Sequence, residues 1–290
     1  METIILQGVK NARDLGGIRT ADGKSIRTKR LIKCGQLCGA TPEDIQLLRD
    51  TYDVKLIVDL RTEAERKAFP DPDIKGASNI WNPIFKEGMQ GAGVFTPGEK
   101  EILEKHLKAL FILNHQKDVM EEAAMQTVRE MIQTQEFVPE AYMARMYQKF
   151  VNNQVIQKQI KQFFFLLVNR RGGAVLWHCG AGKDRSGICC ALLLYALGVS
   201  KEEIIAMYAQ SAESSEDTVE YILEKLFPSS VPGNKEYQTI AREMFGKKTC
   251  YIEAFFKAIE RDYCSVDNYL QKAVELHVDN IVRLKTLYLV

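Results

Sequence analysis

The 290-residue sequence lacks a strong net charge and long apolar runs. Its 39 Lys and Arg residues against 38 Asp and Glu give a formal net charge of +1, so the chain as a whole does not attract nucleic acid or an anionic membrane. No apolar run approaches the ~20 residues that span a bilayer, and the start METIILQGVK lacks the features of a secretory signal peptide. We therefore expect a cytoplasmic protein without stable membrane insertion. Secretion without a signal peptide stays open, as does the oligomeric state.

The sequence also lacks a regular cysteine pattern. Its seven cysteines are odd in number, irregularly spaced and without a CxxC pair, which argues against a disulfide framework and favours free thiols in a reducing compartment. His178 and Cys179 are adjacent, but no second ligand pair at structural-zinc spacing accompanies them. We expect neither a metal nor another cofactor.

Two short apolar segments have the composition of buried strands, and each is followed by helix signals. They are VKLIVDL at residues 54–60 and GGAVLWHC at residues 172–179. The second leads into GICCALLLYALG at residues 187–198, which is apolar nearly all round and predicts a central helix. Strands that each feed a helix predict an α/β fold, with a central, mainly parallel sheet flanked by helices. In such sheets ligands bind beyond the carboxyl ends of the strands.

We expect a single domain over residues 1–290, with two additions to the sheet. Residues 1–40 alternate short β-type runs with turn signals and predict a small antiparallel decoration. Residues 97–151 have charged and apolar positions at helical spacing and predict a helical insertion. This insertion can act as a lid over the carboxyl edge of the sheet. Ordinary core packing between its helices is the other interpretation.

The loop after the second strand combines a cysteine, small residues and three charged residues. In order, it consists of Cys179, Gly180, Ala181, Gly182, Lys183, Asp184 and Arg185. The small residues allow successive backbone N–H groups to converge on one anion, next to a helix N-terminus. The same groups favour a nucleophilic thiolate at Cys179. Arg185 can present its planar guanidinium to two oxygens of a phosphate.

Other motifs that bind anions fail on spacing. A nucleoside-triphosphate P-loop would need Gly at Trp177 and Ser or Thr at Asp184. In GAGVFT the third glycine of a dinucleotide fingerprint is replaced by Thr96. A sulfurtransferase also has a cysteine in a cradle loop, but the arginine at position 185 favours a bound phosphoryl group.

The string His178-Cys179-x5-Arg185-Ser186 resembles the signature of the cysteine-dependent protein tyrosine phosphatases, His-Cys-x5-Arg followed by Ser or Thr. With NARDLGG near the N-terminus and VDLRTEAER between, the longer string HCGAGKDRSG resembles the bacterial subfamily that includes mycobacterial tyrosine phosphatase B. The resemblance covers nearly the whole chain. It implies a phosphatase-like fold and hydrolysis through a phosphocysteine intermediate, without a metal.

The resemblance also implies roles for individual residues. Cys179 would attack phosphorus, and Arg185 would clamp the equatorial oxygens. Ser186 would assist turnover of the intermediate, and His178 would order the loop. The residues expected to bind the substrate phosphate are Gly180, Ala181, Gly182, Lys183, Ser186 and His178. Lys183 is also linked by the resemblance to phosphoinositide substrates, whereas a solvated surface lysine is the alternative.

Two carboxyl groups are candidates for the general acid that protonates the leaving group. Asp184 lies in the loop itself, and the Lys-Asp-Arg triplet of the subfamily supports it. Asp59 ends the first strand, so a parallel sheet would bring it to the same edge as Cys179. Asp59 is therefore a second candidate acid or an orienting group, and a pair with Arg61 is its structural alternative.

We expect a hydrolase of phosphate monoesters, most simply a protein tyrosine or dual-specificity phosphatase. The expected partner is a phosphorylated protein or a phosphoinositide, and no nucleic acid. A phosphoinositide phosphatase is the enzymatic alternative. A phosphate-binding module without turnover is the alternative of a different class, although the intact set Cys179, Asp184, Arg185 and Ser186 counts against it.

Overall fold

The computed structural model of the chain describes residues 1–85, 139–170, 172–210, 239, 242 and 248–290. These residues form a six-stranded sheet in the order β1-β2-β3-β6-β4-β5. The strands are β1 (Glu2–Thr3), β2 (Arg13–Asp14), β3 (Leu31–Cys34), β4 (Val54–Asp59), β5 (Ser78–Trp81) and β6 (Ala174–His178). The four strands from β3 to β5 in this order are parallel, and only β1 and β2 run antiparallel to their neighbours. The predicted α/β class with a mainly parallel sheet is confirmed.

Both strands predicted from apolar segments lie inside the sheet, as β4 and β6, with a strand on each side. Asp59 at the end of β4 is in register with His178 at the end of β6, so the residues that follow these strands meet at one edge. The segment 1–40 contributes more than an antiparallel decoration. Its strand β3 pairs in parallel with β6, and Cys34 is in register with His178.

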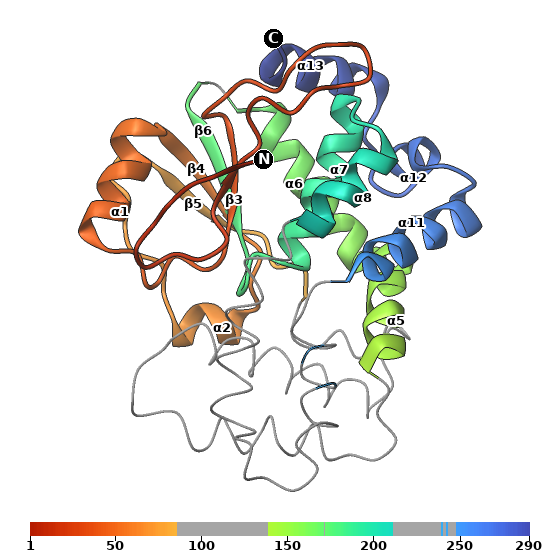
Figure 1. Cartoon of the computed structure of the whole chain (residues 1–290), viewed down its shortest axis with the longest axis horizontal. Coiled ribbons are helices and arrows are strands. Elements are labelled where there is room, and N and C mark those ends of the chain that lie inside the picture. The colour runs from red at the N-terminus through yellow and green to blue at the C-terminus, as the bar shows by residue number, and fades with distance from the viewer. Residues whose placement is uncertain (86–138, 171, 211–238, 240–241, 243–247) are drawn as a thin grey trace, which may run out of the picture.

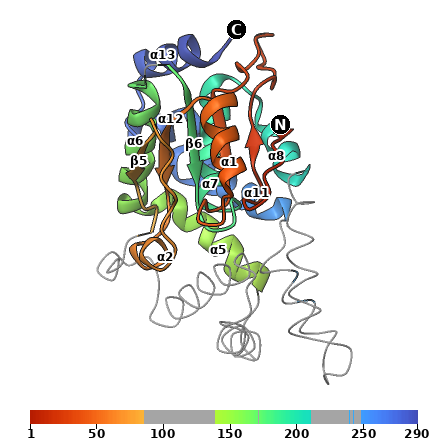
Figure 2. The same ribbon diagram turned by 90° about the vertical axis from the view of Figure 1, so that its left-hand side faces the viewer.

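Helices cover both faces of the sheet (Figures 1 and 2). On one face lies α1 (Pro42–Gln46), which continues as a π-helical turn over Leu47–Thr51, and α2 (Glu63–Ala68) follows β4. The other face carries α5 (Pro139–Asn152), α6 (Gln154–Val168), α7 (Arg185–Leu197), α8 (Lys201–Gln210), α11 (Thr249–Tyr263), α12 (Val266–Lys272) and α13 (Val278–Tyr288). The strand side chains alternate accordingly: Leu176 belongs to the apolar cluster on the α1 side, and Trp177 to the cluster with the larger helical layer.

The predicted central helix is α7, and it begins directly at the end of the cysteine loop. All of its residues except Tyr195 are buried, which fits its apolar sequence. Gly198 ends the helix in the left-handed conformation, with φ at 101°. Because α7 is enclosed, its N-terminus holds a fixed position at the carboxyl edge of the sheet.

The expected helical insertion over residues 97–151 lies only partly within the described residues. Residues 97–138 are outside them, so the lid stays a prediction. The remainder belongs to α5, where Met143 and Met146 are buried in the main core. For these two methionines the structure supports core packing. In the described part of the chain, no helix combines the length and the apolarity required to cross a membrane.

Candidate active site

The loop between β6 and α7 is a tight turn of small residues packed against the end of β3. Gly182 has φ at 69°, a conformation that residues with a side chain rarely adopt. A Cβ atom at Gly182 would also come within 2.6 Å of the Cys34 carbonyl carbon. Glycine is therefore required here by conformation and by space, as the sequence predicted for a cradle.

The backbone carbonyl groups of the loop accept hydrogen bonds from residues of the N-terminal segment. The Asn11 side chain donates to the Ala181 carbonyl at 3.2 Å and to the Gly182 carbonyl at 2.8 Å. The Gln36 backbone N–H donates to the Gly180 carbonyl at 2.9 Å. Because a trans peptide directs its C=O and N–H in opposite directions, these contacts turn the loop N–H groups away from β3. An arrangement of this kind is the one that an anion-binding nest requires.

Arg185 is held in place by a carboxylate before any substrate arrives. Its Nη1 and Nη2 donate to the two carboxylate oxygens of Glu65, both at 2.7 Å, and both side chains are buried. Glu65 also accepts from the backbone N–H of Thr62 at 2.8 Å, in the capping box that starts α2. Burial opposes ionisation of Glu65, but the charge and hydrogen bonds of Arg185 lower the pKa of its carboxyl overall. The Arg185 guanidinium is thus fixed in orientation at the N-terminus of α7.

Cys179 and Ser186 face each other across the loop. The Cys179 Sγ lies 3.5 Å from the Ser186 Oγ, so the hydroxyl can donate to a thiolate. Cys179 is 2% exposed. Within the same sequence stretch, Cys189 lies inside α7, where burial raises the pKa of its thiol well above the ordinary range. Cys189 is therefore a core residue of α7.

Asp184 accepts a hydrogen bond from Tyr147, which is one of two buried tyrosines in contact with each other. The Tyr147 hydroxyl on α5 donates to Asp184 Oδ1 at 2.6 Å, and the Tyr208 hydroxyl on α8 lies 2.7 Å from that of Tyr147. Burial, followed by the negative charge of Asp184, raises the pKa of both tyrosines well above the ordinary range. Both hydroxyls therefore stay neutral, and Tyr147 acts as a donor to the carboxylate.

Lys183 lies inside the protein, and it is not a solvated surface lysine. It is 2% exposed, and its Nζ is 3.7 Å from Asp184 Oδ2. Burial lowers the pKa of Lys183, while the negative charges of Asp184 and Cys179 oppose that change. The Lys183 amine therefore lies within the loop, next to the Asp184 carboxylate.

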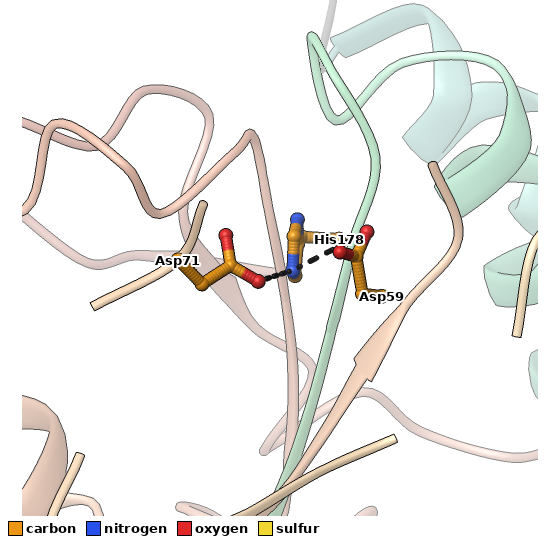
Figure 3. Close-up of side chains that lie close together, drawn as sticks. All are labelled: Asp59, Asp71 and His178. Atoms are coloured by element: carbon orange, nitrogen blue, oxygen red, sulfur yellow. Dashed lines mark hydrogen bonds and ion pairs between the residues drawn. The ribbon is translucent and has the colours of Figure 1, made fainter. Parts of the chain in front are cut away.

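Asp59 belongs to a buried ion-pair network (Figure 3). Its Oδ1 accepts from the Arg61 Nε and its Oδ2 from the Arg61 Nη2, both at 2.9 Å. The Arg61 Nη2 also donates to Asp71 at 2.8 Å, and the His178 Nε2 lies 3.0 Å from Asp71 Oδ2. This geometry matches the pair with Arg61 that the sequence allowed. The network holds His178, and with it the start of the cysteine loop.

Asp59, Asp71 and His178 place one potential metal-ligand atom each within 4.8 Å of one another. Arg61 already donates to both carboxylates, and its side chain is fully buried between them. A metal cation there would meet the positive charge of the guanidinium. The arrangement therefore suits an ion-pair network rather than a metal centre.

The model of the tyrosine phosphatase family matches residues 4–290. The chain belongs to this family. Its members hydrolyse phosphate monoesters, and the chain is a hydrolase of that kind.

Three relatives have names that agree with the family. A Cupriavidus necator protein named as a tyrosine-protein phosphatase is 27% identical over 93% of this chain and 83% of its own length. The triple specificity protein phosphatase PtpB of Mycobacterium tuberculosis is 30% identical over 46% of this chain and 49% of its own length. A tyrosine-protein phosphatase of Nostoc commune is 54% identical over 19% of each chain.

The phosphatase loop depends on three residues that the sequence analysis did not single out. Glu65 could have been noticed as the acidic residue of a capping box in TEAE, but its partner Arg185 is 120 residues away. Asn11 has φ at 56° and begins the string NARDLGG, which carries the resemblance to the family but does not indicate a contact with the loop. No local sequence pattern indicates the role of Tyr147, because a helical segment does not show which of its tyrosines contacts the loop.

Proposed function

We propose that this chain is a protein tyrosine phosphatase in which Cys179 is the nucleophile and Asp184 the general acid. The observation that carries the proposal is the buried pair of Arg185 and Glu65. It fixes a guanidinium beside a nest of N–H groups, with the Cys179 thiol at the start of the same loop.

Substrate binding uses the N–H donors of Arg185 and of the loop that are not bound within the fold. A guanidinium has five N–H donors, and Glu65 takes two of them, so about three remain for phosphate oxygens. The loop N–H groups supply the other contacts, and the N-terminus of α7 adds partial positive charge. Because these groups are positioned before the reaction, they stabilise the charge on the equatorial oxygens in the transition state.

The first chemical step forms a phosphocysteine. The Cys179 thiolate attacks phosphorus, the bond from phosphorus to the leaving oxygen breaks, and the protonated Asp184 carboxyl transfers its proton to that oxygen. In the second step a water molecule attacks phosphorus and gives a proton to the Asp184 carboxylate. The Sγ–P bond breaks, phosphate is released, and the Ser186 hydroxyl stabilises the returning thiolate.

Tyr147 and Tyr208 act on this proton transfer through Asp184. A neutral Tyr147 hydroxyl donates to Oδ1, so the proton for the leaving group is carried by Oδ2. Tyr208 in turn fixes the Tyr147 hydroxyl. We assign both tyrosines as positioning residues.

Asp59 is proposed as an orienting residue rather than the acid. Both of its oxygens accept from Arg61, and it is 0% exposed. Because both oxygens already bind Arg61, neither is free to contact the leaving group of a substrate. Its role is to hold Arg61, and through Asp71 the ring of His178.

Phosphotyrosine in proteins is the first proposed substrate, as in the names of the relatives. The name of PtpB states a triple specificity for that protein, and dual specificity is therefore part of the proposal. A phosphoinositide is the second candidate, because the resemblance of the loop sequence links Lys183 to such substrates.

The test measures hydrolysis of p-nitrophenyl phosphate by the wild type, by Cys179→Ser and by the matched control Cys264→Ser, whose cysteine is exposed. We expect Cys179→Ser to lose activity and both other proteins to keep it with or without a chelator. Acid-quenched wild type should contain phosphoprotein. Activity that survives in Cys179→Ser but disappears with chelator would refute the mechanism. A panel of phosphotyrosine, phosphoserine and phosphothreonine peptides and phosphoinositides then decides the substrate class.

A further inference from the structure

A pocket of about 270 Å³ lies at the opposite end of the sheet from Cys179. Its lining residues are Arg27, Arg30, Arg170, Gly172, Gly173, Thr286, Leu287 and Tyr288. We call it the arginine pocket.

The arginine pocket is separate from the phosphatase loop. Arg30 directly precedes β3 and Gly173 directly precedes β6, and these parallel strands run from the pocket toward Cys34 and His178. The five residues of β6 span roughly 16 Å at about 3.3 Å per residue. A phosphate at Cys179 therefore cannot occupy this pocket as well.

The three arginines of the pocket are not neutralised by acidic residues. No acidic residue is among those that line it. Within the described residues, no carboxylate pairs with the guanidinium groups of Arg27, Arg30 or Arg170. Arg170 Nε donates to the Gly172 carbonyl at 2.9 Å. In contrast, the buried Arg61 and Arg185 each meet a carboxylate.

Two helix ends near the pocket do not account for this charge. The C-terminal carbonyls of α6 and α13 already have donors. Arg283 Nε donates to the Val168 carbonyl at 2.8 Å, the Tyr288 hydroxyl to the Leu167 carbonyl at 2.9 Å, and the Arg27 backbone N–H to the Tyr288 carbonyl at 2.8 Å. Each helix C-terminus also contributes only about half a negative charge. Three guanidinium groups against two such ends leave a positive excess of about two charges.

One wall of the pocket is anchored to the core through Tyr288. Tyr288 is 3% exposed and anchored to α6 through its hydroxyl. Burial raises the pKa of Tyr288, and the positive charges of Arg170 and Arg30 act in the opposite direction. The arginines line the pocket beside this anchored residue, and a pocket of this size can accept a phosphate group with part of its carrier.

We propose that the arginine pocket is a second, non-catalytic site that binds the phosphate group of a phosphorylated small molecule or lipid headgroup. Guanidinium groups bind phosphate oxygens through two N–H donors at once, and a dianionic phosphate balances the excess charge of the pocket. A ligand held there is at the far end of the sheet from the reacting phosphate. It can therefore bind at the same time as a substrate, without competing with it, and can tether the enzyme to the carrier of the phosphate.

The test titrates inorganic pyrophosphate into the Cys179→Ser protein by calorimetry. We expect two classes of sites, of which the double variant Arg30→Gln and Arg170→Gln loses one by about tenfold or more in affinity. The matched control Arg19→Gln removes an exposed charge outside the pocket and should keep both classes. A single class of sites that is indifferent to the double substitution, or equal losses in the control, would overturn the proposal.

Sedimentation with phosphatidylcholine vesicles, with and without a phosphoinositide, distinguishes the two sources of the phosphate. A headgroup ligand predicts vesicle binding that the double variant loses, and a soluble ligand predicts pyrophosphate binding alone. The double variant made with Cys179 intact should hydrolyse p-nitrophenyl phosphate like the wild type. The catalytic mechanism is tested by the Cys179→Ser substitution, and the pocket by the double arginine substitution. Either hypothesis can therefore fail without the other.

Discussion

Two buried arginines, Arg185 and Arg61, form the same kind of contact with a carboxylate. They differ in how many of their N–H donors remain available to a ligand. Arg185 meets Glu65 through two hydrogen bonds of 2.7 Å, and Arg61 meets Asp59 through two of 2.9 Å. Arg61 also donates to the Phe69 carbonyl and to Asp71, so all three of its side-chain nitrogens are engaged. The Nε of Arg185 has no hydrogen-bond partner within the described residues.

The difference separates an arginine that holds the scaffold from one that receives a ligand. The Arg61 side chain is fully buried and uses four of its five N–H donors within the fold, so it has almost nothing to offer a substrate. A guanidinium bound on one side only is fixed in orientation and still has donors to offer. By the same reasoning, the arginines of the arginine pocket are candidates for a ligand.

The largest expected effect is on Arg185. Arg185→Lys keeps the charge but loses the planar donor, so we expect kcat/KM for p-nitrophenyl phosphate to fall by about a thousandfold. Steady-state kinetics measures it, with the exposed Arg49→Lys as control. A loss below about tenfold would show that the guanidinium geometry is not used in the transition state.

Asp184→Asn removes the proposed acid. We expect kcat with phenyl phosphate, a poor leaving group, to fall by about a hundredfold, and kcat with p-nitrophenyl phosphate to fall much less. Asp59→Asn serves as the comparison, because a carboxylate that orients Arg61 should leave the dependence on leaving group unchanged. The opposite pattern would assign the acid to Asp59.

Arg61→Met tests the scaffold role. The change leaves Asp59 and Asp71 buried without their cation, so the free energy of unfolding should drop by about 3–5 kcal/mol. Urea unfolding measures it. Arg49→Met, at an exposed pair with Asp50, should change stability by less than about 1 kcal/mol. A similar small loss in Arg61→Met would contradict the comparison between the two buried arginines.

The same network predicts a loss of stability in acid. Burial opposes ionisation of Asp71, but the hydrogen bond and charge of His178, together with Arg61, lower the pKa of its carboxyl from 3.8 to about 2. A carboxyl with a lowered pKa stabilises the folded state above its unfolded pKa. That stability, about 2 kcal/mol, is lost as the pH falls from about 4 to about 2. Urea unfolding across this range should show a shallower acid loss for Asp71→Asn, and equal slopes would refute the assignment.

Local signals predicted the strands β4 and β6, the helix α7 and the loop between them. Each was encoded in a continuous run: apolar strand residues, Gly182 where no side chain fits, and the buried sequence of α7. The supports of the site were not predictable in this way. Asn11 reaches the loop across 170 residues and Glu65 across 120, and no periodicity records such contacts. The place of β3 in the parallel sheet was missed for the same reason, because strand order is set by tertiary packing.

The smallest expected effect belongs to Tyr147, which contacts the acid but not the phosphate. Tyr147→Phe keeps the ring in the core and removes only the donor to Asp184 Oδ1, so kcat with phenyl phosphate should fall by about tenfold while KM changes little. Tyr195→Phe is the matched control, because Tyr195 donates to Asp267 in a similar pair on the exposed side of α7. A purely structural role would lower stability in Tyr147→Phe and leave the dependence on leaving group as in the wild type. Such a result would limit the role of Tyr147 to the stability of the fold.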